Sequence, residues 1–208
     1  LSDVRVAFRT DSGHGLIGES CAGRSRLMRV LGGGLQATAG SVAIGGEPVV
    51  LASPRDALTR GIAHVSQEGS LVPALTGAEN ILLGDEPRWA GGVIRREALR
   101  RRARALVARW FPEVAIDLDQ PVAGLPMADQ KVIEIVRALR GSVSLVILDE
   151  PTASLPAREK EQLWGIIRSL PAQGVGVVLI SHFLSEIKAL SDRITVLRDG
   201  RLIRTERA

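Results

Sequence analysis

The sequence predicts an α/β protein with a mainly parallel sheet, and three observations lead to this prediction. Short apolar runs alternate with segments of helical periodicity along most of the 208 residues, which is the pattern of strands joined by helices. Residues 145–148, Leu-Val-Ile-Leu, form a continuous apolar run, as expected of a strand buried on both faces. A hydrophobic content of 45% is enough to fill the core of one compact domain of this length.

Each predicted strand is a short apolar or β-branched run that turn-forming residues separate from its neighbours. The predicted strands are residues 4–8, 15–17, 41–44, 62–65, 143–148, 175–180 and 194–197. The runs 15–17, 143–148 and 175–180 each end directly before polar or glycine-rich residues of functional interest.

Each predicted helix has apolar residues three and four positions apart, which places them on one face. The predicted helices are residues 24–31, 54–60, 78–83, 94–110, 128–139, 158–170 and 183–190. In the helix 94–110, Leu99, Ala103 and Val107 share a face while arginines occupy most of the remaining surface. Because the interval from about residue 76 to residue 139 lacks a convincing strand, we expect a helical insertion there.

A glycine-rich segment after the second predicted strand fits a phosphate-binding loop, with Arg24 where lysine is expected. Glycines allow backbone N–H groups to close around phosphate oxygens, and the next helix directs its positive end at them. The candidate phosphate-binding residues are Gly18, Glu19, Ser20, Cys21, Ala22, Gly23, Arg24, Ser25 and Arg26. The Ser25 hydroxyl is also a candidate Mg²⁺ ligand. An ordinary glycine-rich turn is the alternative, but it would leave the acidic strand end downstream unexplained.

Asp149 and Glu150 directly follow the apolar run 145–148, and ligands of open α/β sheets gather beyond the carboxyl ends of strands. Asp149 is a candidate Mg²⁺ ligand, and Glu150 is a candidate to orient or deprotonate a water that attacks a phosphoryl group. The alternative is a helix that merely begins with acidic residues after a strand. The phosphate-binding loop upstream favours the metal and nucleotide interpretation.

His182 follows the run 175–180, so it also lies at the carboxyl end of a predicted strand. It is a candidate to contact the phosphate that Glu150 prepares water to attack, and a satisfied loop histidine is the alternative. His14 and His64 have no comparable support, so we interpret them as packing or strand-edge residues. The three tryptophans are interpreted as core or contact residues.

Composition argues against several classes of protein. No apolar segment is long enough to cross a bilayer, and the start of the chain does not have the pattern of a secretory signal. Cys21 is the single cysteine, so it cannot form an internal disulfide, which fits a reducing compartment. Much of the basic excess lies in residues 95–109 without interleaved stacking aromatics, and tyrosine is absent. We therefore expect a solvated or partner-facing helix there and no nucleic acid binding.

Together the motifs resemble the ATP-binding subunit of an ABC transporter over nearly the whole chain. The matching positions are Gln67 (Q-loop), Leu125 to Gln130 (signature), Asp149 and Glu150 (Walker B aspartate and catalytic glutamate), Ala153 to Leu155 (D-loop) and His182 (switch histidine). Residues 70–73, 78–84 and 133–135 look like the first ATPase half of carbohydrate importers of the ribose and galactose type.

The resemblance implies one ABC-type ATP-binding domain over residues 1–208. Its fold is a P-loop NTPase with a mainly parallel sheet flanked by helices, and a helical subdomain at about 76–139 lies between the Q-loop and the signature region. It implies ATP and Mg²⁺ as ligands, with Gln67 reaching the metal and the attacking water and His182 contacting the γ-phosphate. The implied function is ATP binding and hydrolysis that energise import of a solute, and the carbohydrate-importer segments above imply that this solute is a sugar.

The resemblance also implies partners and a location. The partners are a second ATPase domain, as a tandem half or a homodimer, transmembrane permease subunits and, indirectly, a solute-binding protein. The location is cytoplasmic and peripheral, on the inner face of the cell membrane.

Several positions depart from the family pattern. Arg24 replaces the lysine, Cys21 replaces a small residue of the loop and Arg26 replaces a hydroxyl residue. In the signature, Pro126 removes a serine hydroxyl whose hydrogen bond to a charged group is worth roughly 1.5–3 kcal/mol. These changes support an alternative function, a regulatory partner domain of an ABC ATPase that binds nucleotide but is deficient in hydrolysis. Residues 1–4 resemble the family's second strand, so we expect the first strand, with its adenine-stacking aromatic, to be missing.

A third function, an ABC ATPase of DNA repair or translation, lacks support. The sequence contains no coiled-coil insertion and no basic surface with interleaved aromatics.

Overall fold

The computed structural model of the chain describes residues 1–18, 22–67, 69–153 and 155–208. These residues form two compact units. The first unit contains residues 1–67, 141–151 and 167–208, and the second contains residues 68–140 and 152–166. Strands dominate the first unit and helices dominate the second.

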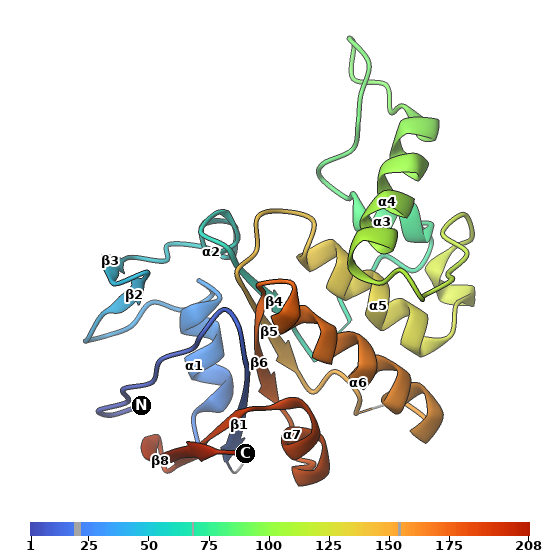
Figure 1. Ribbon diagram of the computed structural model, residues 1–208. Helices are drawn as coiled ribbons and strands as arrows, with labels where there is room; N and C mark the ends of the chain where they lie inside the picture. Colours follow the sequence, from blue (N-terminus) through green and yellow to red (C-terminus); the bar gives the residue numbers. More distant parts are fainter. Residues whose placement is uncertain (19–21, 68, 154) are drawn as a thin grey trace. The chain divides into compact units, whose positions relative to one another are not determined.

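The first unit is built on a six-stranded sheet with the order β4-β5-β6-β1-β7-β8 (Figure 1). Its strands are β1 (Gly13–Gly18), β4 (Ile62–Val65), β5 (Leu145–Asp149), β6 (Gly176–Ile180), β7 (Arg193–Arg198) and β8 (Arg201–Arg207). All neighbours pair in parallel except β7 and β8, which are antiparallel. The predicted α/β fold with a mainly parallel sheet is therefore confirmed.

Helices cover both faces of this sheet next to β1. The first unit contains α1 (Arg24–Leu31), α2 (Pro54–Thr59) and α7 (Leu184–Leu190). Leu16 of β1 belongs to the same buried cluster as Leu27 and Met28 of α1. Its neighbour Gly15 faces α7, because a Cβ added there would lie 2.5 Å from Cγ2 of Ile187. Since successive strand residues point to opposite faces, α1 and α7 lie on opposite sides of β1.

The strand predicted at residues 4–8 is wrong. The segment has no strand assignment, although Val4, Val6 and Phe8 are partly buried against the core cluster and the residues between them are exposed. The alternation that predicted a strand is therefore present, but a strand also needs a ladder of backbone hydrogen bonds. Just before this segment, the Ser2 N–H donates to the Gly200 carbonyl at 2.8 Å, and no ladder continues from it into the described residues 4–8.

Two observed strands were not predicted, β3 (Glu47–Val49) and β8. Strand β3 pairs with β2 (Val42–Ile44), the counterpart of the predicted strand 41–44, in a separate two-stranded sheet. The proline inside β3 argues against a strand when the sequence is read alone. Gly45 and Gly46, with φ of 60° and 90°, join the pair and are the hairpin signal that could have revealed it. Strand β8 lies at the sheet edge and has four charged residues among its seven, a composition typical of protected edges.

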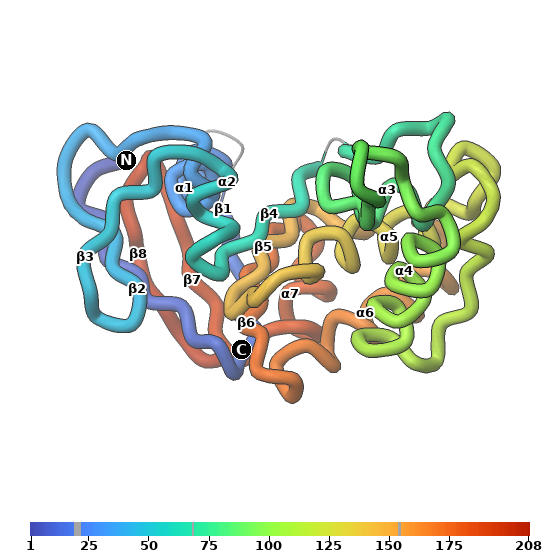
Figure 2. Tube along the Cα trace, turned by 90° about the horizontal axis from the view of Figure 1, so that it is seen from above, coloured from blue at the N-terminus to red at the C-terminus, as the bar shows by residue number. Residues whose placement is uncertain are grey.

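The second unit is helical. It contains α3 (Gly77–Ile81), α4 (Arg96–Trp110), the short 3₁₀ helix η1 (Val122–Gly124) and α5 (Met127–Ala138). Helix α3 packs against α4 and α5, and these two also contact each other (Figure 2). Helix α6 (Ala157–Ala172) contributes residues to both units. Every predicted helix has a counterpart, with ends shifted by at most two residues.

The largest functional consequence of these shifts lies at the start of α4. The predicted helix began at Ile94, whereas α4 begins at Arg96. The preceding residues form a hairpin, in which the Arg95 N–H donates to the Pro87 carbonyl at 2.8 Å.

No described helix combines the length and the apolar character that crossing a bilayer requires.

A capping box fixes the start of α3. Removing this box by mutation tests how much it contributes to stability. The Thr76 hydroxyl accepts from the Glu79 N–H at 3.2 Å, and the Glu79 carboxylate accepts from the Thr76 N–H at 2.9 Å. We expect Thr76→Ala to lower the free energy of unfolding by about 1 kcal/mol, measured by urea titration. Thr59→Ala, at the exposed end of α2, is the control with an expected change within about 0.5 kcal/mol. Equal losses in both variants would contradict the role of the box.

Candidate functional site

The carboxyl ends of three neighbouring strands meet at one edge of the sheet in the first unit. Ile180 of β6 is in register with Leu16 of β1 on one side and with Asp149 of β5 on the other. Ligands of open parallel sheets collect at such an edge, where loops follow the strands. The segments that follow β1, β5 and β6 therefore form the candidate site.

Two glycines of the predicted loop are required by the backbone. A Cβ added at Gly18 would lie 2.5 Å from the Leu197 carbonyl oxygen and 2.9 Å from Cβ of Ala22, a separation too short for any side chain. Gly23 has φ of 90°, a conformation that glycine adopts without strain. The candidate residues Glu19, Ser20 and Cys21 lie outside the described residues.

The start of α1 provides positive potential at this edge. Gly23 is the N-cap residue, and the helix has neither a side-chain cap nor an acidic residue in its first turn. The N–H groups of a first helical turn have no partner within the helix, so they attract an anion. Arg24 Nη1 donates to the Ser181 carbonyl at 3.4 Å, and Ser25 and Arg26 are exposed. The Arg24 side chain thus connects the start of α1 with the residue that follows β6.

Glu150 and His182 are brought together by the ends of β5 and β6. His182 Nδ1 lies 3.0 Å from Glu150 Oε1, and the Glu150 N–H donates to the Ile180 carbonyl at 2.9 Å. Glu150 has φ of 47°, in the left-handed region that non-glycine residues seldom adopt and that often marks functional sites. The Phe183 ring lies 4.2 Å from the His182 ring. This neighbourhood therefore holds the Glu150 carboxylate in one place.

Asp149, the last residue of β5, is half-buried directly before Glu150. Burial raises its pKa above the ordinary aspartate value, the charges of His64 and Arg24 lower it, and the charge of Glu150 raises it. A partly buried carboxylate beside another carboxylate is favoured in its charged form by a cation. Asp149 is consequently suited to bind a metal ion.

Sequence reasoning missed two residues of this edge. His64, interpreted above as packing or strand-edge, lies on β4 close enough to Asp149 for their charges to interact. Ser181 accepts from Arg24 through its carbonyl, and its hydroxyl accepts from the Phe183 N–H at 3.0 Å. The position of Ser181 directly after a strand is the signal that could have revealed it.

The predicted residue Gln67 is exposed. It lies two residues beyond Val65 of β4, which pairs with Leu148 of β5.

The segments compared with the family's signature and D-loop lie in the second unit. Pro126 precedes α5 without a side-chain cap, and Met127 is 53% exposed at the first helical position. Gln130 Nε2 donates to the Leu125 carbonyl at 2.9 Å, so this side chain binds its own loop. Of the D-loop segment, Leu155 is buried, while Ser154 lies outside the described residues.

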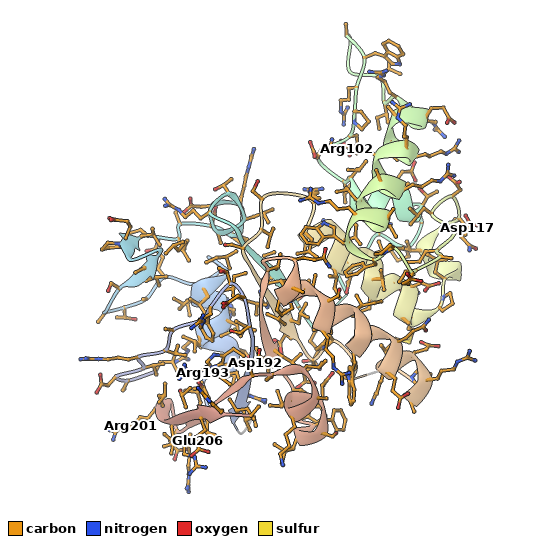
Figure 3. The ribbon with its side chains drawn as sticks, in the orientation of Figure 1. Arg102, Asp117, Asp192, Arg193, Arg201 and Glu206 are labelled. Atoms are coloured by element: carbon orange, nitrogen blue, oxygen red, sulfur yellow. The ribbon has the colours of Figure 1, made fainter. Side chains whose placement is uncertain are left out.

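The remaining histidine has a packing environment. His14 is buried, its Nε2 lies 2.7 Å from the Thr195 hydroxyl, and the Phe8 ring contacts it. The strand start beside it carries Asp192, which accepts from the Gly13 N–H at 2.8 Å, and Arg193 (Figure 3). Burial lowers the pKa of His14 to about 4, and Arg193 contributes to the shift. These contacts are consistent with the packing interpretation.

Comparison with a model of the ABC transporter family gives a match over residues 1–153. The chain belongs to the ABC transporter family. The ribose import ATP-binding protein RbsA of Rhodococcus jostii strain RHA1 is 46% identical to this ABC domain over 192 residues, which are 92% of the chain and 38% of that protein. RbsA of Hahella chejuensis is 43% identical over 203 residues, or 98% of the chain and 40% of that protein.

A third relative extends the likeness to other sugar importers. The putative ribose/galactose/methyl galactoside import ATP-binding protein 2 of Burkholderia cenocepacia is 42% identical over 208 residues. That alignment covers 99% of this ABC domain and 40% of the relative. The chain thus spans about two fifths of the length of the curated relatives that it matches.

Solved structures share the fold of this ABC domain. A dimeric post-hydrolysis state of the ATP-binding cassette MJ0796 bound to ADP and Pi has a TM-score of 0.79 and 23% identity, covering 98% of this chain and 88% of that one. The ADP conformation of the cassette MJ1267 has a TM-score of 0.81 and 22% identity, covering 99% and 84%. The fold is therefore that of an ABC cassette.

Proposed function

We propose that the chain is an ATP-binding and ATP-hydrolysing domain that energises import of a sugar. The observation that carries this proposal is the convergence of Arg24, Asp149, Glu150 and His182 at one edge of the parallel sheet, with direct contacts between Arg24 and Ser181 and between His182 and Glu150. The names of the relatives support the sugar, since two are ribose import proteins and the third is named as a putative ribose/galactose/methyl galactoside import protein.

The loop and the start of α1 would hold the phosphates. The proposed contacts are the backbone of residues 18–23, the Arg24 guanidinium and the first-turn N–H groups of α1. Gly18 and Gly23 fit this role, because a Cβ at either position is excluded by neighbouring atoms or by φ. Ala22 and Arg26 complete the candidate loop residues, with Arg26 exposed at the surface.

The residues at the strand end fit a magnesium ion. Among the described residues, no group of three or more His, Cys, Asp or Glu side chains is placed to hold a metal. Mg²⁺ is commonly bound through one or two carboxylates together with phosphate oxygens. Asp149 is the proposed carboxylate ligand, and Ser25 and Gln67 are proposed to complete the protein side of the site. When bound, the ion would neutralise charge on the phosphate oxygens.

Glu150 is the proposed base. Its carboxylate would orient a water and accept a proton as the water oxygen attacks the terminal phosphorus of ATP, giving ADP and phosphate. His182 Nδ1 holds one oxygen of this carboxylate at 3.0 Å, which restricts the positions from which Glu150 can act. Gln67 is proposed to contact the same water, and His182 to steady the γ-phosphate.

The second unit contributes a proposed helical subdomain at about residues 76–139 of an ABC-type domain that covers residues 1–208. Proposed partners are a second ATPase domain, as a tandem half or a second copy, with permease subunits and, through them, a solute-binding protein. A peripheral position on the cytoplasmic face of the membrane follows from those partners. The relatives' greater length supports a tandem arrangement.

A nucleotide-binding regulatory domain without turnover is the second candidate. The start of α5 favours it, since Pro126 offers no hydroxyl and Met127 exposes a side chain at the signature position. Hydrolysis of Mg-ATP by the purified chain, measured as phosphate release beside nucleotide binding, separates the two. Binding with turnover supports an ATPase, binding without turnover in the presence of its partner domain supports the regulator, and no binding contradicts both.

Arg24 provides a sharper test of the phosphate-binding loop. We expect Arg24→Met to weaken Mg-ATP binding by about 10- to 100-fold, because a hydrogen bond to a charged group contributes roughly 1.5–3 kcal/mol. Arg24→Lys should lose less affinity than Arg24→Met, since it keeps the positive charge although it lacks the planar fork. Displacement of a fluorescent ATP analogue measures both. Arg29→Met, on the exposed part of the same helix, is the matched control, and an equal loss there would contradict the assignment.

A further inference from the structure

The hairpin before α4 exposes large apolar side chains next to one another. Trp89, Val93 and Ile94 are 61%, 66% and 40% exposed, although tryptophan is usually well buried in a folded domain. They belong to the hairpin of residues 87–95, which is part of the second unit, whereas the candidate site is built from residues of the first unit. Neighbouring exposed apolar residues of this size are typical of a surface that another molecule covers.

This hairpin is held by its backbone. The Trp89 N–H donates to the Val93 carbonyl at 2.8 Å, and the Gly92 N–H donates to the Trp89 carbonyl at 3.0 Å. Arg88 Nη1 donates to the Gly92 carbonyl at 3.0 Å. Gly91 and Gly92 have φ of 96° and 86°, as a tight reversal requires. Such a fixed hairpin loses little conformational freedom when a partner binds.

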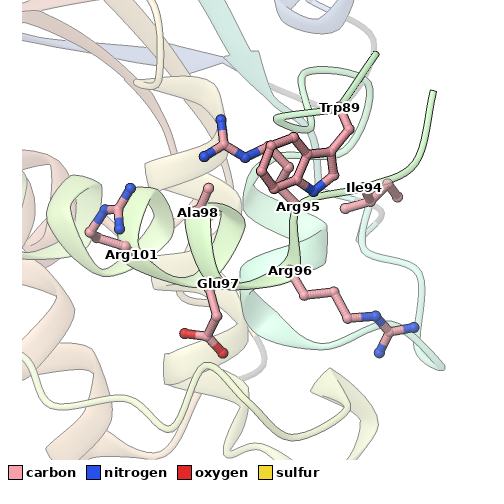
Figure 4. Close-up of a pocket in the computed structure, with 7 residues that line it drawn as sticks. All are labelled: Trp89, Ile94, Arg95, Arg96, Glu97, Ala98 and Arg101. Carbon is pink, nitrogen blue, oxygen red and sulfur yellow. The ribbon is translucent and has the colours of Figure 1, made fainter. Parts of the chain in front are cut away.

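A pocket of about 350 Å³ lies between the hairpin and the first two turns of α4. Figure 4 shows the Arg95 side chain against the Trp89 indole, with Ala98 and Arg101 along the helix and Ile94 on the hairpin. The Arg95 guanidinium carbon lies 4.4 Å from the Trp89 ring centroid. The pocket therefore combines an apolar wall with positive charge, and its size suits a few side chains.

The charge on this pocket is not neutralised by its own carboxylate. Arg95, Arg96 and Arg101 line it together with Glu97, and Glu97 accepts from Arg100 at 2.9 Å. Within the part of the chain that the structure describes, no carboxylate lies within ion-pair distance of Arg96 or Arg101. The charge of Arg96 acts on the Glu79 carboxylate from beyond that distance, so Arg101 is the more available of the two. The start of α4 has no side-chain cap, so its dipole adds positive potential.

We propose that this pocket binds a peptide segment of a protein partner that presents a carboxylate beside an apolar side chain. The carboxylate meets the arginines at the start of α4, and the apolar side chain packs on Trp89 and Ile94. Tryptophan and arginine are the residues most enriched at the energetic centres of protein interfaces. A concave pocket with an indole wall selects an inserted side chain, whereas Arg95 covers a face of the indole that entry into a lipid surface would need free.

The test is a selection from a displayed library of random twelve-residue peptides on the immobilised full chain. We expect the enriched peptides to contain Asp or Glu next to Leu, Ile or Phe. With a synthetic copy of one such peptide, fluorescence anisotropy should give a Kd that Trp89→Ala raises by about 30-fold and Arg101→Glu by about tenfold. Trp89→Phe keeps an aromatic ring and should cause a smaller loss.

Controls separate this surface from the candidate nucleotide site and from simple unfolding. Arg109→Glu makes the same charge change at the exposed far end of α4 and should change Kd by less than about twofold. Circular dichroism checks that each variant is folded, and Mg-ATP hydrolysis should be unchanged in Trp89→Ala. A chain that binds the peptide but does not hydrolyse Mg-ATP would contradict the proposed function and would still support the peptide pocket.

Several outcomes would overturn the proposal. They are the absence of enriched peptides, enriched peptides without a carboxylate, and binding that is insensitive to Trp89→Ala or equally weakened by Arg109→Glu. Co-sedimentation with vesicles of phosphatidylcholine and phosphatidylglycerol, lost in Trp89→Ala and stronger than peptide binding, would assign the surface to the membrane instead.

Discussion

Replacement of Glu150 by Gln is expected to lower the rate of Mg-ATP hydrolysis by about 10²- to 10⁴-fold, the usual contribution of a positioned general base. The amide has nearly the shape of the carboxylate but cannot accept the proton of the attacking water. Nucleotide affinity should change little, because the proposed phosphate contacts come from the loop, Arg24 and α1. Phosphate release measures the rate, and displacement of a fluorescent ATP analogue measures the affinity.

The matched control is Glu47→Gln, the same change at an exposed position of β3, with an expected effect on turnover of less than about twofold. Unaltered hydrolysis in the Glu150→Gln variant would rule out Glu150 as the base. His182→Ala removes the group 3.0 Å from Glu150 Oε1 and should lower turnover as well. If it did not, the contact between these two residues would have no part in the reaction.

The second large effect is a loss of stability in acid. Burial lowers the pKa of His14 to about 4 in the folded chain, with a contribution from Arg193, whereas an unfolded histidine titrates near about 6.5. The unfolded state therefore binds a proton first as the pH falls. The His14 contribution is fully present above about pH 6.5 and is lost between there and about pH 4, a change of roughly 3 kcal/mol.

Urea unfolding of the wild type and of His14→Gln from pH 7 to pH 4 measures this contribution. The wild type should lose about 3 kcal/mol more over that range than the variant. Burial lowers the pKa of His64 as well, and this residue is present in both proteins, so its contribution cancels in the comparison. Direct NMR titration of the His14 ring is a second measurement that does not depend on the variant. A ring pKa at the ordinary value, or equal slopes for both proteins, would refute the expectation.

Local patterns predicted most of the elements, and the failures have identifiable physical causes. The helices from α1 to α7 were found because their apolar faces repeat with helical spacing, which is a property of adjacent residues. The segment 4–8 has the alternation of a half-buried strand, but a strand exists only with a partner ladder. Strand β8 was missed because its charges suit an edge, and only the sheet order shows that it lies at one.

The proposed site residues were also visible in the sequence as far as their chemistry was concerned. The glycine-rich loop and the acidic strand end have spacings that phosphate and metal binding require. Nothing in the order of residues indicated the left-handed backbone of Glu150, the contact of Arg24 with the Ser181 carbonyl, or the proximity of His64 to Asp149. Each of these depends on strands that are neighbours in the sheet but distant in the chain.

The sequence by itself determined the class of fold, the family and the residue types available for phosphate and metal binding, because periodicity and motif spacing are local properties. Only the tertiary structure decided which of those residues meet, since β5, β6 and β1 become neighbours through pairing between distant segments. The same holds for the pocket beside Trp89, where a hairpin that ends at Arg95 leaves an indole exposed among arginines. Burial and proximity are consequences of folding, so no local pattern reports them.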